Sequence, residues 1–434
     1  MKLVNIFLLA SLLMVVSCEN DLDQSPPNIA SSNSLTDFTG VLNAAYFYQH
    51  ATVTPMAVMG DFRADNALME EEPYPSFDRF NGDLVDMEDQ FFSPFYNAAY
   101  KSILSANSVI ENSSNPIQVG EAQFLRALSY FKLVRVFGDV PVNLSSTPST
   151  TDPSILERQP AASIYSNVII PDLEAAVGAL GTEIVNGRAS KFAAQGMLGK
   201  VYAQIGDYTN ALPELQAVVN GASSAGITLL DNFADIFGVD NDLNAEVIYA
   251  QQISSSIVDE YGFSEFWSWS AGLDTKSLMP LDPDLIAAFD ASPGDLRRAV
   301  TIDETLMASP KFPQTGGPDH DWIELRLADV ILLYAEALNE TGNTSGAITE
   351  LNKIRTRAGL EGSTASSQVE VRQAIQDERR LELAFEGQRW FDLVRTGTAS
   401  AEMGQSIDAR YYLFPVPISE ILASFGVITQ NDGY

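Results

Sequence analysis

Residues 327–354 read LADVILLYAEALNETGNTSGAITELNKI and carry the pattern that decides the fold. In the first half of this segment, apolar residues recur at the spacing of one helical face: Leu327, Val330, Ile331, Tyr334 and Leu338. The second half repeats this spacing at Ile348, Leu351 and Ile354. Gly342 separates the halves, and glycine accepts the left-handed backbone that a tight turn between helices requires. The segment therefore predicts two antiparallel helices joined by a short turn.

A second segment shares this spacing. The intervals between Gly199, Tyr202, Gly206 and Ala211 equal those between Ala335, Leu338, Gly342 and Ala347. Small residues let two helices approach closely, so both segments are typical of helix pairs of the tetratricopeptide type. A strict tandem repeat of about 34 residues is absent, so we expect these pairs within a less regular body. The predicted fold class is mainly α, a tetratricopeptide-like helix-pair scaffold with a loop-rich half.

The rest of the chain fits one domain over residues 37–434. Helical blocks are expected at about 37–60, 90–220 and 323–400, and a loop-rich insert at about 222–322. Within the second block, one helical stripe contains Phe124, Ala127, Leu128, Phe131 and Val134. Gly138 ends this helix, and Pro141 prevents its resumption. Inside the insert, residues 246–251 read as a strand.

Residues 1–17 predict a secretory signal, with one early cation, a short apolar run and a small residue before Cys18. The quartet Val15-Val16-Ser17-Cys18 resembles the lipobox of bacterial lipoproteins, in which the peptide is cut before the cysteine and the cysteine carries lipid. Residues 18–36 are polar and Pro-rich, and we expect them to form a lipidated flexible tether. The protein would then be anchored to a membrane surface without spanning it. The alternative is an ordinary cleaved signal followed by a free thiol.

Cysteine content and charge exclude several classes of protein. Cys18 is the only cysteine in 434 residues, so an intramolecular disulfide is impossible. The chain has 57 acidic and 25 basic residues, for a net charge of −32. Such a surface repels nucleic acid and argues, less strongly, against a strongly anionic ligand. The alternative interpretation is that the acidity serves only solubility.

Four blocks of sequence resemble the SusD/RagB family of outer-membrane nutrient-binding lipoproteins and stand in the family's order. They are 120–131 (GEAQFLRALSYF) continuing to 137–141 (FGDVP), 326–337 (RLADVILLYAEA) with 352–359 (NKIRTRAG), 378–395 (ERRLELAFEGQRWFDLVR), and 412–420 (YLFPVPISE) leading to 430–434 (QNDGY). The resemblance implies a helical scaffold without catalysis that sits as a lid on a SusC-like TonB-dependent barrel. Such proteins capture oligosaccharides, occasionally peptides, and deliver them to the barrel. The chain is shorter than many relatives, which suggests trimmed loops around the binding face.

Aromatic side chains in loops are the first candidates for sugar contacts, because aromatic faces cover the C–H faces of sugar rings. Residues 260–272 (EYGFSEFWSWSAG) concentrate such side chains among Ser and Gly: Tyr261, Phe266, Trp267 and Trp269. If this segment is extended, Trp267 and Trp269 project on the same side and form a shelf. The alternative is that these rings pack the loop-rich half. The other two tryptophans are expected to be structural, with Trp390 in the core and Trp322, which precedes the next helix, as a staple or an edge residue.

A second candidate cluster lies in 59–66 (MGDFRADN) and just beyond it. Its members are short polar groups suited to bridging sugar hydroxyls, followed by one aromatic ring: Asp61, Arg63, Asp65, Asn66 and Tyr74. The resemblance adds that ligand contacts in the family come partly from this N-terminal loop and partly from the central loop region. The alternative is an Asx-rich turn that caps a helix.

Neither a metal nor another cofactor is expected. His50 and His320 are the only histidines and lack local His or Cys partners. Residues 240–246 alternate oxygen donors as a calcium loop does, but Ala245 replaces the turn glycine and Gln251 the bidentate glutamate. No phosphate-cradling loop or nucleophile motif occurs in the sequence.

The favoured function is capture of a neutral oligosaccharide or polysaccharide at the outer-membrane surface and its delivery to a SusC-like TonB-dependent transporter. The expected partners are the glycan, the transporter and, through the lipid, the membrane, with no nucleic acid. Two alternatives stay open: a glycoside hydrolase that uses two carboxylates as acid and base, and a helical-repeat scaffold that binds only proteins.

Overall fold

The computed structural model describes residues 35–70, 72–149, 151–185, 187–254, 256, 281–312 and 319–434. The expected signal, Cys18 and most of the tether lie outside the described residues, as does the segment 257–280. Within the described part of the chain, none of the helices combines the length and the apolarity that crossing a lipid bilayer requires.

The helices of the first half of the chain are α2 (Thr39–Gln49), α3 (Val53–Ala57), α4 (Ser76–Arg79), α5 (Ser93–Asn112), α6 (Pro116–Phe137), α7 (Ala161–Ile164), α8 (Ile170–Ala179), α9 (Lys191–Gln204) and α10 (Tyr208–Gly221). Those of the second half are α12 (Pro283–Asp290), α13 (Arg298–Thr301), α14 (Leu327–Glu340), α15 (Thr344–Arg357), α16 (Gln368–Leu383), α17 (Arg389–Thr396), α18 (Ala399–Glu402) and α19 (Ile418–Ala423). The strands are β1 (Val140–Pro141), β2 (Arg158–Gln159), β3 (Val247–Gln251) and β4 (Trp322–Arg326).

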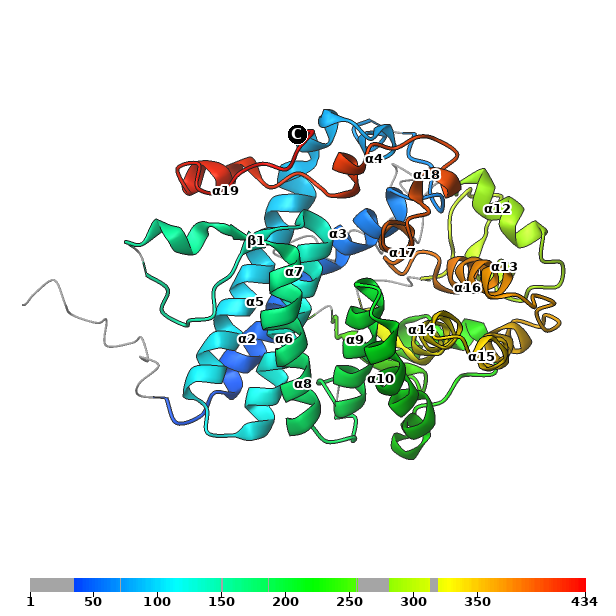
Figure 1. The fold of residues 1–434 in the computed structure, drawn as a ribbon, viewed down its shortest axis with the longest axis horizontal. Coiled ribbons are helices and arrows are strands. Elements are labelled where there is room, and N and C mark those ends of the chain that lie inside the picture. Colours follow the sequence, from blue (N-terminus) through cyan, green and yellow to red (C-terminus); the bar gives the residue numbers. More distant parts are fainter. Residues whose placement is uncertain are drawn as a thin grey trace, which may run out of the picture.

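The long helices form one row in which each contacts the next. The row starts with α2 and α5, continues through α6, α8, α9 and α10, and ends with α14 and α15 (Figure 1). Gly206 and Gly342 join α9 to α10 and α14 to α15 with φ of 75° and 91°, in the left-handed region that favours glycine. A Cβ on Gly199 would lie 2.5 Å from the Leu215 side chain. The close approach of α9 to α10 therefore requires glycine at this position. The predicted helix-pair scaffold is confirmed.

A short antiparallel sheet of β3 and β4 joins the loop-rich half to the start of α14. The predicted strand at 246–251 is confirmed, since β3 occupies 247–251. All ten residues of the two strands are buried, as is typical of a sheet covered on both faces. Trp322 begins β4 and is buried, so the expectation that it lies at an edge is wrong, whereas Trp390 is in the core as expected.

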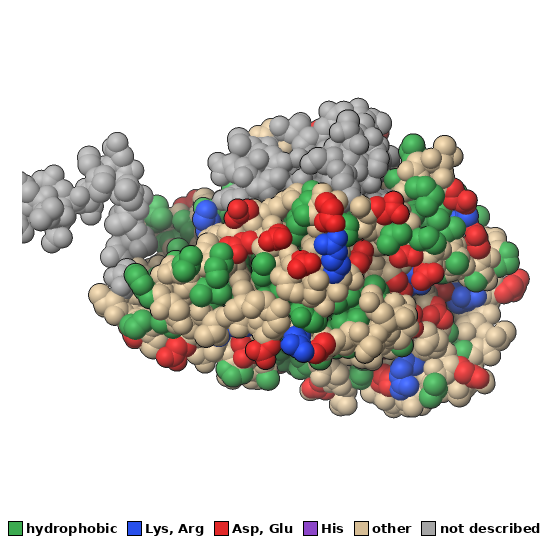
Figure 2. All heavy atoms as spheres, turned by 90° about the horizontal axis from the view of Figure 1, so that it is seen from above, with side chains coloured by type: hydrophobic (Ala, Val, Ile, Leu, Met, Phe, Trp, Pro, Cys, Tyr) green, Lys and Arg blue, Asp and Glu red, His purple; other side chains and the backbone are tan. Residues whose placement is uncertain are grey.

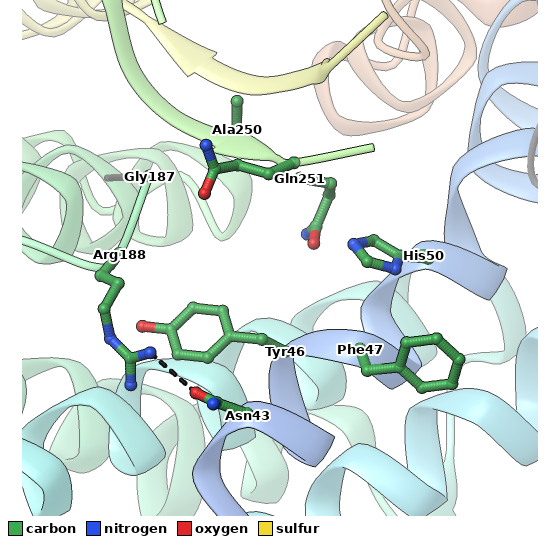
Figure 3. Close-up of a pocket in the computed structure, with 9 residues that line it drawn as sticks. Asn43, Tyr46, Phe47, His50, Gly187, Arg188, Ala250 and Gln251 are labelled. Carbon is green, nitrogen blue, oxygen red and sulfur yellow. Dashed lines mark hydrogen bonds between the residues drawn. The ribbon is translucent and has the colours of Figure 1, made fainter. Parts of the chain in front are cut away.

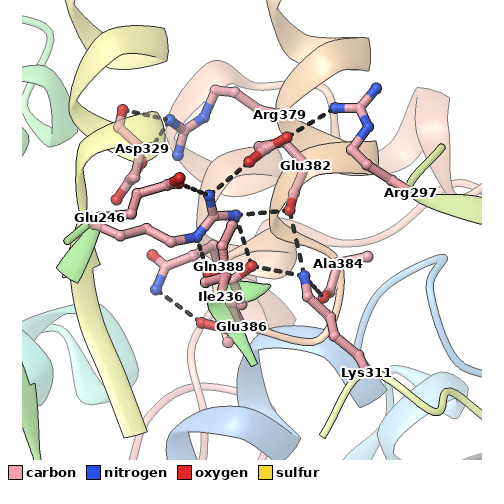
Figure 4. Close-up of polar contacts among 12 residues, drawn as sticks. Ile236, Glu246, Arg297, Lys311, Asp329, Arg379, Glu382, Ala384, Glu386 and Gln388 are labelled. Carbon is pink, nitrogen blue, oxygen red and sulfur yellow. Dashed lines mark hydrogen bonds and ion pairs between the residues drawn. The ribbon is translucent and has the colours of Figure 1, made fainter. Parts of the chain in front are cut away.

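A buried ionic network surrounds the end of this sheet (Figure 4). Arg326 donates to Glu246 at 2.8 Å, Glu382 at 2.6 Å and Glu386 at 2.8 Å. Arg297 reaches the other oxygen of Glu382 at 3.0 Å, and Arg357 and Lys311 bind members of the same set. Burial alone would raise the pKa of Glu382, but Arg357, Arg326 and Arg297 hold it well below its usual range. These buried charges are therefore mutually compensated.

The N-terminal region meets the C-terminal block at a backbone contact without side chains. Gly60 lies in the π-helical turn Val58–Phe62 and faces Gly387, which has φ of 71°. A Cβ on Gly60 would collide with the backbone of Gly387. Because neither backbone can yield cheaply, only glycine fits at position 60.

We predict that Gly60→Ala lowers the free energy of unfolding by about 3 kcal/mol, since overpacking against backbone forces the two segments apart. Urea unfolding followed by circular dichroism measures the change. Gly178→Ala is the matched control, because nothing lies within 4 Å of its Cβ position in α8, and it should be neutral or stabilising by up to about 1 kcal/mol. Equal stability of the two variants would contradict the contact.

Two neighbouring carboxylates, Asp242 and Asp321, lie beside Ile253. Asp321 accepts a hydrogen bond from the Ile253 amide at 2.8 Å, and Asp242 accepts one from the Asp321 amide at 3.0 Å. Burial, with the charge of Asp242 in second place, raises the pKa of Asp321 to about 7. The folded protein therefore favours the protonated form of Asp321, whereas the unfolded chain ionises it near its ordinary value. The free energy of unfolding therefore falls as the pH rises from about 4 to 7, because the unfolded chain releases the proton of Asp321 more readily than the folded protein does.

We predict that Asp321→Asn stabilises the protein at pH 8 by about 2 kcal/mol, because the amide cannot ionise and its oxygen can still accept from Ile253. The gain should shrink towards zero near pH 4.5. Urea unfolding of both proteins at pH 4.5, 6 and 8 measures it. A difference that stays constant with pH would show that the Asp321 carboxylate is not the titrating group.

Candidate functional site

The expected aromatic shelf lies outside the described residues, because Tyr261, Phe266, Trp267 and Trp269 all fall within 257–280. The scaffold holds both flanks of this segment. On the N-terminal side, Ile253 is bound to Asp321. On the C-terminal side, Leu281 forms an antiparallel bridge with Ala67, and its amide donates to the Met307 carbonyl at 3.0 Å.

The second expected cluster is buried. None of its five members is more than 4% exposed: Asp61, Arg63, Asp65, Asn66 and Tyr74. Asp61 accepts hydrogen bonds from the amides of Phe385 at 3.0 Å and Gly387 at 2.6 Å. Burial raises the pKa of Asp61 to about 6, against these hydrogen bonds, which lower it. Asp61 thus holds the turn after α16.

The other members of this cluster also have internal partners. Arg63 donates to the carbonyls of Phe77 at 2.9 Å and Tyr411 at 2.6 Å, and its guanidinium lies 4.5 Å from the Phe80 ring centroid. Asp65 accepts from Arg389 at 2.7 Å, Asn66 donates to Asp61 at 2.8 Å, and Tyr74 accepts from Gln90 at 2.9 Å. This corrects the sequence-based expectation: the five side chains tie the N-terminal segment to the C-terminal block and present no surface to a ligand.

A pocket of about 360 Å³ lies between α2, the 187–188 turn and the end of β3 (Figure 3). It is lined by Asn43, Tyr46, Phe47, His50, Gly187, Arg188, Ala250, Gln251 and Gln252. The residue after β3, Gln252, stands five positions before segment 257–280. The pocket therefore adjoins the chain that leads into the aromatic segment.

The floor of the pocket is a hydrogen-bonded ion pair. The Glu121 carboxylate accepts from the Tyr46 hydroxyl and from Arg188 Nε, each at 2.6 Å. The Arg188 guanidinium lies 4.7 Å from the Tyr46 ring centroid, and its Nη1 donates to Asn43 Oδ1 at 2.9 Å. Burial raises the pKa of Tyr46 well above its ordinary value, so its hydroxyl stays protonated and donates. The floor is rigid and carries no net charge.

The upper wall contains a buried glutamine. Gln251 is 2% exposed, and its Nε2 is shielded from solvent, so this nitrogen does not face the open space of the pocket. The rings of Phe47 and His50 meet edge to face at 5.7 Å between centroids and form the adjacent wall. Amides beside aromatic faces suit an uncharged ligand rich in hydroxyl groups.

Sequence reasoning missed this pocket, although part of its signal was present. Asn43, Tyr46 and His50 recur at the three- and four-residue spacing of one face of α2. The remaining lining residues come from the turn at 187–188 and from β3, more than 130 residues further along the chain. No local pattern in the sequence joins these three segments.

The residues considered for metal binding have other roles. Glu246 belongs to the buried ionic network, and His320 accepts from the Gly238 amide at 2.9 Å. Burial lowers the pKa of His320 to about 4. Among the described residues, no group of three or more His, Cys, Asp or Glu side chains is arranged to hold a metal ion.

Comparisons with known proteins agree along the chain. A family model described as "Starch-binding associating with outer membrane" matches residues 17–203, and the SusD family model matches residues 300–434. SusD-like protein P2 of Formosa agariphila is 27% identical over the full length of both chains. The starch-binding protein SusD of Bacteroides thetaiotaomicron is 23% identical over 77% of this chain and 76% of its own.

Solved structures show the same fold. A SusD superfamily protein from Parabacteroides distasonis superposes with a TM-score of 0.77 at 22% identity, over 94% of this chain and all of its own. A laminarin-binding SusD-like protein superposes with a TM-score of 0.75 at 26% identity, over 92% of this chain and 99% of its own. With the helix-pair scaffold and the two family models in register, the chain belongs to the SusD/RagB family.

Proposed function

We propose that this protein captures oligosaccharides or polysaccharides at the cell surface and delivers them to a SusC-like TonB-dependent transporter. The observation that carries the proposal is the pocket lined by Gln252, whose walls carry aromatic and amide side chains. Among similar proteins, one binds starch and another binds laminarin, both of them neutral glycans.

A neutral glycan fits the charge of the protein. The net charge is −32, and Figure 2 shows carboxylates spread over one face with fewer cationic side chains. An anionic polysaccharide would be repelled by such a surface. A ring stacked on one indole contributes on the order of 1 kcal/mol, so several contacts are needed for micromolar binding.

Binding without catalysis is part of the proposal. None of the described residues that line the pocket carries a carboxylate, and Glu121 on its floor is held by Tyr46 and Arg188. A glycoside hydrolase needs two carboxyl groups free to act on opposite sides of the bond. Incubation with a panel of polysaccharides should therefore release no reducing ends.

The lipid anchor at Cys18 would hold the protein at the outer membrane. Sixteen residues separate Cys18 from Leu35, where the described structure begins, and this linker spans at most about 60 Å. This length lets the domain stay close to a membrane-embedded partner and raises the local concentration of captured glycan.

An apolar ridge on α19 is the proposed contact for the transporter. Its members are two residues of α19 and one in the turn that follows the helix, and they are 51%, 70% and 98% exposed: Ile418, Leu422 and Phe425. Phe425 has φ of 55°, a left-handed conformation that is costly for a bulky residue, and Figure 1 shows α19 at one end of the molecule. Large apolar side chains that are exposed together on one surface are typical of protein interfaces.

Charge around the ridge indicates what the partner surface should carry. Glu88 accepts hydrogen bonds from the amides of Ile418 at 2.7 Å and Ser419 at 3.0 Å, which places segment 82–100 beside α19. Segments 82–100 and 411–434 contain six acidic residues and no Lys or Arg. We therefore expect an apolar socket with a basic rim on the transporter.

We predict that Trp267→Ala or Trp269→Ala weakens retention in affinity electrophoresis against neutral polysaccharides about fivefold while the melting temperature stays unchanged. Each variant loses one ring of the proposed shelf. Phe425→Ala is the matched control, because it removes an exposed ring elsewhere and should leave retention unaltered. Unchanged mobility of both Trp variants would remove this segment from the site, and retention only by uronate polymers would overturn the preference for neutral glycans.

We predict that the double variant Leu422→Ser/Phe425→Ser keeps glycan binding but reduces co-purification with the SusC-like transporter at least about tenfold, as expected when interface anchors are lost. Pull-down from detergent-solubilised membranes with quantification of the transporter measures this. Val369→Ser is the control, since Val369 is an exposed apolar residue at the start of α16. Undiminished co-purification of the double variant would exclude the ridge as the contact.

A further inference from the structure

We propose that Tyr46 is the stacking platform of the pocket in Figure 3 and that its ring takes the C–H face of a pyranose unit, so that the protein prefers glucans to fructans. The inference rests on the proposed glycan-binding function and names the class of sugar that this pocket accepts. Its basis is the fixed position of the ring, its partial exposure and the polar groups around it.

The Tyr46 ring is held at its polar end and on one face. Its hydroxyl donates to Glu121 at 2.6 Å and accepts from the Ala189 amide at 3.0 Å. The Arg188 guanidinium lies over the ring, 4.7 Å from its centroid. Arg188 is itself bound to Glu121 at 2.6 Å and to Asn43 at 2.9 Å. These contacts fix the ring before any ligand arrives, so binding costs little ordering of this side chain.

The side of the ring opposite Arg188 is the part that a ligand can reach. Tyr46 lines the pocket and is partly exposed. Because the guanidinium covers one face, the accessible part of the ring belongs to the other face and to the edge. Phe47 and His50 form the adjacent wall and line the same pocket. An aromatic face of this kind favours contact with the C–H groups of a sugar ring.

Polar groups lie around this platform. Asn43 and Gln252 line the pocket and are exposed. Asn43 Oδ1 accepts from Arg188, which leaves the NH₂ group of this amide for a ligand. Sugar hydroxyls both donate and accept hydrogen bonds, so amides match them. Arg188 also lines the pocket, but its charge is already neutralised by Glu121, which favours an uncharged sugar.

A pyranose ring with equatorial hydroxyls matches both features. Its axial C–H groups form a flat apolar face, and its hydroxyls project outward around the rim. A fructofuranose ring is smaller and carries substituents on both faces, so it covers an aromatic ring less well. The pocket volume of about 360 Å³ lies within the range of about 300–1,000 Å³ that is usual for small ligands. Glucopyranose units are therefore the better fit.

The test uses laminarin and amylose, which consist of glucopyranose, and inulin, which consists of fructofuranose. Isothermal titration calorimetry with the unlipidated full-length protein (Cys18→Ser) gives the dissociation constant for each. At least one of the two glucans should bind about fivefold more tightly than inulin. This comparison tests the preference without any substitution in the pocket.

The variant Tyr46→Leu should weaken binding of that glucan about fivefold, because it removes the aromatic face. Tyr46→Phe keeps the ring and should bind within about twofold of the parent protein. Both variants lose the hydroxyl that binds Glu121, so only the ring distinguishes them. Circular dichroism establishes that each variant is folded at the temperature of the titration.

Tyr208→Leu is the matched control. Tyr208 also donates to a glutamate that binds an arginine, Glu336 with Arg395, but it lies on α10 and does not line the pocket. The control variant should bind the glucan like the parent protein.

Contrary results would separate the two proposals. If Tyr46→Leu binds like the parent protein, or Tyr46→Phe loses as much affinity as Tyr46→Leu, the ring face is not the platform. Inulin bound as tightly as the glucans, or more tightly, overturns the preference for pyranose units. Each of these results leaves glycan capture standing. Failure of the folded parent protein to bind any of the three glycans refutes glycan capture as proposed, and the platform with it.

Discussion

Arg326 and the carboxylates around it form the contact on which the rest of the structure depends. The guanidinium binds Glu246 before β3, Glu382 near the end of α16 and Glu386 just beyond that helix, so it joins three segments far apart in the sequence. Charges this deeply buried are stable only when opposite charges neutralise them, and removal of one partner typically lowers the stability of the fold by about 3–5 kcal/mol. Without a possible intramolecular disulfide, the loop-rich half is held to the helical half by this network and by apolar packing.

The network also determines where the candidate site lies. Glu246 precedes β3 and binds Arg326, so the network fixes the start of this strand. Gln251, at the other end of β3, forms a wall of the pocket. The opposite wall comes from α2, which packs against α5 and α6 in the helix row. The ion pair of Arg188 with Glu121 then connects α6 to the turn that closes the side of the pocket. Each part of the pocket is thus supported by a rigid element behind it.

The helix pairs were predictable because their signal is local. The spacing around Gly342, and again around Gly206, specifies helix, turn and helix within about 30 residues. The strand that ends at Gln251 could be predicted for the same reason. The polar cluster at 61–66 misled because its partners, Phe385, Gly387 and Arg389, lie more than 300 residues away, and short polar side chains look alike in a loop and in a buried network. The pocket was missed because three distant segments build it. Whether Trp267 and Trp269 contact glycan stays a prediction.

The residues on both sides of segment 257–280 are fixed to the scaffold, and this affects how the sequence between them can change. Ile253 and Leu281 are each fastened to the scaffold by backbone hydrogen bonds, through Asp321 and Met307, whatever residues stand between them. Substitutions, insertions or deletions within the interval would therefore leave the helix row and its ionic centre intact. If the proposed glycan contacts lie in this stretch, the ligand can change during evolution while the scaffold stays the same.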